Sequence, residues 1–94
     1  MVSSGLEVLR QKFITRCRGD LELVRALAID TSRGAEPAVR TVIHRISGIA
    51  GSLGYADLSD LARRVDDGFS GAVSPSPEDV RHLAAELARV AGEV

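Results

Sequence analysis

Apolar residues recur along the chain every three or four positions, which is the spacing that places them on one face of an α-helix. No segment of useful length alternates apolar and polar residues, as a half-buried β-strand would. The pattern therefore predicts an all-α protein built from amphipathic helices.

The first helical segment is predicted to begin with a capping box, in which the Ser4 hydroxyl reaches the Glu7 amide. Its apolar face carries Leu6, Leu9, Phe13 and Ile14. Gly19 and Asp20 are interpreted as an interruption, after which Asp20 caps a short additional helix over residues 20–29. That helix would bury Leu21, Val24, Leu27 and Ala28. A loop is expected over residues 31–34.

Three further amphipathic segments follow, and each has a start or stop signal. The segment at residues 36–53 has Pro37 in its first turn, and Gly54 follows its end. The next helix covers residues 55–69, and the last begins at Ser76, whose hydroxyl can cap it. The residues expected to be buried in these three helices are Val39, Val42, Ile46, Ile49, Ala50, Leu53, Leu58, Leu61, Ala62, Val65, Val80, Leu83, Ala84, Leu87 and Val90.

Short connections between helices of this length favour antiparallel neighbours. We therefore expect an up-and-down antiparallel four-helix bundle with a short additional helix on the N-terminal side. The stretch 70–77, which contains two prolines, is interpreted as a linker between the last two helices. A chain of 94 residues has room for one compact domain, so residues 1–94 are expected to form a single unit.

Composition and charge exclude several classes of function. The net charge is −1, and aromatic residues make up 3% with no Trp, which argues against binding of nucleic acids or membrane surfaces. Cys17 is the only cysteine, so no intrachain disulfide can form and we expect this side chain in the core. No set of metal ligands is evident, and no signal peptide or membrane span is found. These features predict a cytoplasmic protein, with no metal site and with His82 on its surface.

His44 lies in the middle of the helix over residues 36–53, on the side opposite the apolar stripe. The residues that share or border this face are Arg40, Thr41, Ser47, Gly48, Gly51 and Ser52. Glycine inside a helix costs about 0.5–1 kcal/mol relative to alanine, so Gly48 and Gly51 need an explanation. Either another surface approaches the imidazole closely, or a neighbouring helix of the same bundle packs tightly against the glycines.

The segment 44–61 reads HRISGIAGSLGYADLSDL. It resembles the signature of histidine-containing phosphotransfer (HPt) domains, in which an aliphatic residue lies two positions after a histidine and a glycine lies four positions after it. The resemblance implies that His44 is the phosphoacceptor of a two-component phosphorelay. A domain of this kind would carry a phosphoryl group as phosphohistidine between receiver domains and would have no ATP-dependent kinase activity of its own.

The resemblance also implies partners and a docking face. The partners would be receiver domains of response regulators and an upstream hybrid histidine kinase, which would supply Mg²⁺, so this chain would need no cofactor and would act as a monomer. The docking face would include Thr41, Gly48, Gly51 and Ser52. A neutral imidazole has a nitrogen lone pair that can attack the aspartyl phosphate of such a partner.

The sequence departs from the family pattern at one position. The family commonly has a lysine three residues after the histidine, where this chain has Ser47, which supplies no charge. Arg40, one turn before His44, and Arg64, which a helical hairpin would bring back to the same level, are candidates for stabilising the phosphoryl group together with Ser47.

Two alternatives remain open. A degenerate HPt domain or a helical adaptor would bind receivers without accepting phosphate, and Ser47 motivates that hypothesis. A phosphoacceptor hairpin of a sensor kinase is less favoured, because Arg45 stands where that motif has an acidic residue.

Overall fold

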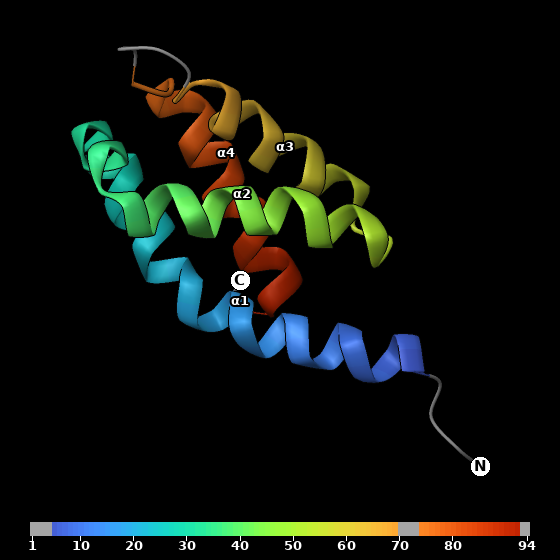
Figure 1. The fold of residues 1–94 in the computed structure, drawn as a ribbon. Helices are drawn as coiled ribbons and strands as arrows, with labels where there is room; N and C mark the ends of the chain where they lie inside the picture. The colour runs from blue at the N-terminus through green and yellow to red at the C-terminus, as the bar shows by residue number, and fades with distance from the viewer. Residues whose placement is uncertain (1–4, 70–73, 93–94) are drawn as a thin grey trace.

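The computed structural model describes residues 5–69 and 74–92, and throughout these ranges the regular structure is helical (Figure 1). The elements are α1 (Gly5–Ile29), the 3₁₀ helix η1 (Thr31–Ala35), α2 (Pro37–Ser52), α3 (Ala56–Asp67) and α4 (Pro77–Ala91). The prediction of an all-α helical bundle is confirmed. The predicted cap at Ser4 and residues 70–73 of the predicted linker lie outside the described residues.

α1 is one continuous helix of 25 residues, so the prediction of an interruption and a short additional helix was wrong. Gly19 is exposed, and the buried positions run on through it in one stripe: Phe13, Cys17, Leu21, Val24 and Leu27. Burial of this stripe outweighs the cost of about 1 kcal/mol for a helical glycine. Asp20 does not cap a new helix, because its carboxylate forms an ion pair with Arg45 of α2.

The four helices pack in a ring in which one seam is weaker than the others. α1 packs mainly on α4, α2 packs mainly on α3, and α3 also packs on α4, whereas α1 and α2 touch least. Their apolar faces form one core, in which Cys17 is fully buried as predicted. Ile43 also belongs to this core, although its burial was not predicted. Ile49, which was predicted to be buried, is 39% exposed at the weak seam.

The N-terminal half of α1 continues past the end of α4 (Figure 1). The Nε atom of Arg18, in the middle of α1, donates a hydrogen bond of 3.0 Å to the carbonyl of Ala91 at the end of α4. α4 therefore ends beside the middle of α1, and the first turns of α1 extend beyond it. Leu6 and Leu9, which the sequence places on the apolar face of this helix, are exposed, at 43% and 55%.

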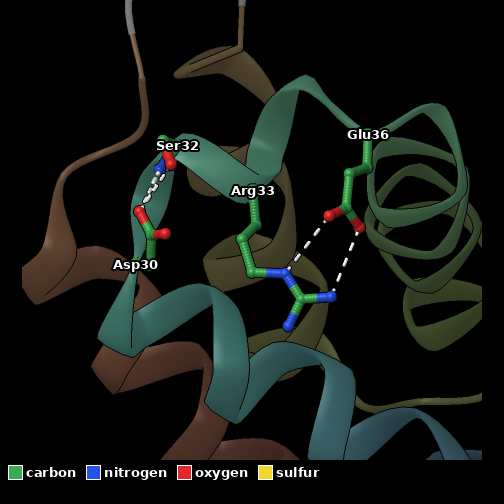
Figure 2. A network of polar contacts seen from close by, with 4 residues as sticks. All are labelled: Asp30, Ser32, Arg33 and Glu36. Carbon is green, nitrogen blue, oxygen red and sulfur yellow. Dashed lines mark hydrogen bonds and ion pairs between the residues drawn. The ribbon is translucent and has the colours of Figure 1, made fainter.

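The connection between α1 and α2 is held by local polar contacts (Figure 2). Asp30 accepts hydrogen bonds from the amide of Ser32 at 3.1 Å and from its hydroxyl at 2.6 Å, which lower the pKa of the Asp30 carboxyl. Arg33 forms an ion pair with Glu36 at 3.3 Å. Because of this turn of 3₁₀ helix, the segment predicted as a loop over residues 31–34 has regular structure.

Phe69, just after α3, connects three elements. A Cβ atom on Gly34 of η1 would lie 2.3 Å from Cε1 of the Phe69 ring. Only glycine therefore allows η1 to approach Phe69 this closely. The Nη2 atom of Arg40 in α2 donates a hydrogen bond of 2.8 Å to the Phe69 carbonyl, and the guanidinium lies 5.3 Å from the ring centroid. These contacts fix the C-terminal end of α3 against the start of α2.

The predicted signals at helix ends are present in the structure. Pro37 lies in the first turn of α2, and Gly54 adopts a φ of +91° directly after its end, a conformation that favours glycine. The hydroxyl of Ser76 accepts a hydrogen bond from the amide of Asp79 at the start of α4. The turn at Gly54 places α2 and α3 side by side as a hairpin.

Candidate functional site

His44 is exposed on α2 and is held by a carboxylate from the neighbouring helix. Its side chain is 78% exposed, and its Nδ1 atom lies 3.0 Å from Oδ2 of Asp66 on α3. The Asp66 side chain is 27% exposed, so it is better shielded from water than the ring it contacts. The outward position of His44 agrees with the sequence interpretation, whereas the role of Asp66 was not predicted.

This contact determines which ring nitrogen of His44 can react. A carboxylate accepts hydrogen bonds, so in the neutral ring it favours the proton on Nδ1 and leaves the lone pair on Nε2. The contact also restricts rotation of the imidazole, so that Nε2 points away from α3. The arrangement is a nucleophile oriented by a second group.

The Ser47 hydroxyl forms a hydrogen bond within its own helix. It donates to the carbonyl of His44 at 2.6 Å. The carbonyl of Ser47 in turn accepts a hydrogen bond of 2.7 Å from the hydroxyl of Ser59, a buried residue of α3. Ser47 therefore joins the helix backbone to α3 in this structure, and its hydroxyl does not contact the His44 ring.

The two predicted arginines are placed differently from each other. Arg40 lies on the His44 face of α2, and its guanidinium contacts Phe69 as described above. Arg64 is exposed on α3, two residues before Asp66. Two residues along an α-helix differ by about 200° around its axis, so the Arg64 side chain lies on the side of α3 away from the Asp66 carboxylate that contacts His44. The structure does not bring Arg64 to the histidine.

The two glycines of α2 have different surroundings. A Cβ atom on Gly51 would lie 3.1 Å from the hydroxyl oxygen of Ser59, so Gly51 allows close packing between α2 and α3. Gly48 has no atom within 4 Å of such a Cβ and borders open space one turn after His44. Thr41 and Ser52 are exposed near the same face, and each donates its hydroxyl hydrogen to the carbonyl four residues earlier.

Arg45, the residue after His44, anchors α2 to α1. Its guanidinium forms an ion pair with Asp20, and the two side chains are only 23% and 16% exposed.

His82, the second histidine, is exposed on α4, as predicted. In residues 5–69 and 74–92 no group of three His, Cys, Asp or Glu side chains is placed to hold a metal ion. No helix in the same ranges is long and apolar enough to cross a membrane.

The fold and this face define a class of protein, namely a small helical bundle that presents one oriented histidine from the middle of a helix. The sequence matches the Hpt domain family over residues 8–93, which is nearly the whole chain, and the protein belongs to that family. No curated protein and no solved structure matches it. Membership indicates a phosphotransfer function in two-component signalling, with receiver domains and kinases as the kinds of partner.

Proposed function

We propose that this domain is a phosphocarrier, with Nε2 of His44 as the atom that receives the phosphoryl group. The observation that carries the proposal is the contact between Nδ1 and Asp66, which leaves Nε2 exposed with its lone pair. The donor is the aspartyl phosphate of one receiver domain, and the acceptor is the aspartate of another. The cytoplasmic location and the monomeric state remain predictions.

The chemical step is a displacement at phosphorus. The Nε2 lone pair forms a bond to the phosphorus atom while the bond to the receiver's aspartate oxygen breaks, and the aspartate leaves as a carboxylate. The Nδ1 proton stays in place beside Asp66, whose negative charge offsets the positive charge that develops on the ring. Mg²⁺ bound by the receiver would stabilise the transferred oxygens, and delivery to the second receiver is the reverse step.

Phosphotransfer profiling tests this proposal. Receiver domains charged with acetyl phosphate and Mg²⁺ are incubated with the protein, and we expect one acid-labile phosphate per chain. His44→Gln should abolish loading, whereas His82→Gln, the matched change at the other exposed histidine, should leave loading unchanged. Loading that persists in His44→Gln would exclude His44 as the phosphoacceptor.

A second candidate is a domain that binds receivers without accepting phosphate. The observation that favours it is that Ser47 and Arg40, two of the three groups proposed to stabilise the phosphoryl group, form hydrogen bonds with backbone carbonyls. This function predicts a receiver affinity that does not change in His44→Ala, together with no detectable transfer to the wild-type protein.

A further inference from the structure

A groove opens at the weak seam between α1 and α2. Its volume is about 440 Å³, and its surface is mostly apolar. Phe13 and Leu53, both almost fully buried, form its base, while Leu9 and Ile49 are exposed at its sides. The groove is open because α1 and α2 contact each other little.

The groove reaches the neighbourhood of His44. Gly48 and Ser52 line it from α2, and Gly48 lies one helical turn after His44, about 6 Å along the helix axis. Gly48 has no side chain to separate the groove from the imidazole, and the space around it is open. A molecule seated in the groove would therefore lie beside the face that presents Nε2.

The two sides of His44 differ in charge. Lys12 and Arg16 line the groove from α1, one turn apart. Both are exposed, and neither makes a hydrogen bond or an ion pair with another residue in the described part of the chain. On the α3 side, the carboxylate of Asp66 lies 3.0 Å from the ring. An acidic partner would be attracted by these two cations, whereas the Asp66 carboxylate beside the ring would repel it locally.

We propose that Lys12 and Arg16 form the electrostatic part of the docking site for the receiver domain. The receiver approaches His44 from the α1 side, places an apolar segment in the groove and sets acidic side chains beside the two cations. This proposal rests on the proposed function, because a receiver that carries an aspartyl phosphate and the carboxylates that hold Mg²⁺ is acidic at its reacting end. Arg40 and Arg45 of α2 are already bound to Phe69 and Asp20, and α1 thereby provides the two cations beside the groove.

The double variant Lys12→Ala/Arg16→Ala tests the charges. We expect the second-order rate constant for transfer from a charged receiver to fall about tenfold at low ionic strength, with a weaker salt dependence than in the wild type. The rate at saturating receiver should stay unchanged, because the cations act on encounter. The charge-preserving variant Lys12→Arg/Arg16→Lys should retain most of the wild-type rate constant.

Arg81→Ala is the matched control. Arg81 is an exposed cation of α4 that lies near Ile29, at the opposite end of α1 from Lys12. The proposal would be overturned if the second-order rate constant fell by the same factor per charge removed in Arg81→Ala and in the double variant, because only the net charge would then matter. An unchanged rate constant in the double variant would overturn it as well.

The apolar part of the site is tested through Ile49. Ile49→Ser should weaken receiver binding, measured by titration calorimetry, because it removes an exposed apolar side chain from the groove wall. A dimer that dissociates in Ile49→Ser, detected by sedimentation, would instead place a second copy of this chain in the groove.

Binding and transfer are measured on the same variants, so the two proposals can fail separately. Wild-type protein that binds a receiver with an affinity dependent on Lys12 and Arg16, but never loads phosphate, would refute the phosphocarrier function alone. Wild-type protein that loads on His44, with both measurements unchanged in the double variant, would refute the docking proposal alone.

Discussion

Replacing Asp66 should slow phosphoryl loading of His44 without abolishing it. In Asp66→Ala the Nδ1 atom loses the acceptor that lies 3.0 Å away in the wild type. The pair is largely open to water, with 78% of the His44 side chain exposed, so the contact contributes about 0.5–1 kcal/mol. A contribution of that size corresponds to about a two- to fivefold lower rate of loading. By contrast, removal of the nucleophile in His44→Gln should leave no measurable transfer.

The assay is rapid-quench measurement of transfer from a charged receiver, together with NMR of the ring nitrogens of His44. We expect a smaller population of the tautomer with its proton on Nδ1 and a lower rate of loading in the same variant. Asp67→Ala is the matched control, because it removes an exposed carboxylate at the next position of α3. An unchanged rate and tautomer population in Asp66→Ala, with the helical circular dichroism intact, would refute the orienting role.

Three further predictions concern the fold. Gly34→Ala should destabilise the protein by about 1–3 kcal/mol in chemical denaturation because the added Cβ would meet the Phe69 ring, whereas Gly19→Ala, where nothing lies within 4 Å, should stabilise it by about 0.5–1 kcal/mol. Asp20→Ala should lower the melting temperature by several degrees, because it leaves a partly buried guanidinium of α2 without its ion-pair partner. Burial raises the pKa of the Cys17 thiol to about 12, so iodoacetamide should label it only on unfolding. The unfolded thiol releases its proton at a lower pH than the folded one, so the free energy of unfolding should decrease from about pH 9 towards pH 12, less steeply in Cys17→Ala.

The features that could be predicted from the sequence are those set by neighbours along the chain. Pro37, Gly54 and Ser76 mark helix ends through local backbone geometry, and the structure has helix ends at all three. The continuity of α1 through Gly19 could not be predicted in this way, because it depends on the neighbouring helices that cover the stripe on both sides of the glycine. The exposure of Leu9 depends likewise on where α4 ends.

The contact between His44 and Asp66 shows where sequence reasoning about the site was incomplete. A hairpin that turns at residues 54–55 returns to the level of His44 near residue 65, which is why Arg64 was predicted to lie near the histidine. The level alone does not determine which side chain points across the hairpin. Ser59 contacts α2, and Asp66 lies two turns further along the same face of α3. Once Ser59 is known to face α2, the spacing of seven residues and the level of His44 along the hairpin together indicate Asp66.

Different charged residues around His44 orient the imidazole ring and attract the receiver domain. A cation next to the imidazole on α2 would stabilise the phosphoryl group while it is bound to His44. Here Ser47 bonds to its own helix, and Arg40 holds the end of α3. The groups that remain are Asp66, which orients the ring, and the cations Lys12 and Arg16 of α1, which lie beside the groove. Neither role requires a cation fixed on the phosphoryl oxygens, so phosphohistidine in this domain should transfer readily to a receiver that brings Mg²⁺. The substitution Ser47→Lys should slow this transfer, because the added cation would stabilise the loaded state. Single-turnover transfer from loaded wild-type and Ser47→Lys protein measures this directly, and a release that is equally fast in both would show that charge at position 47 does not control it.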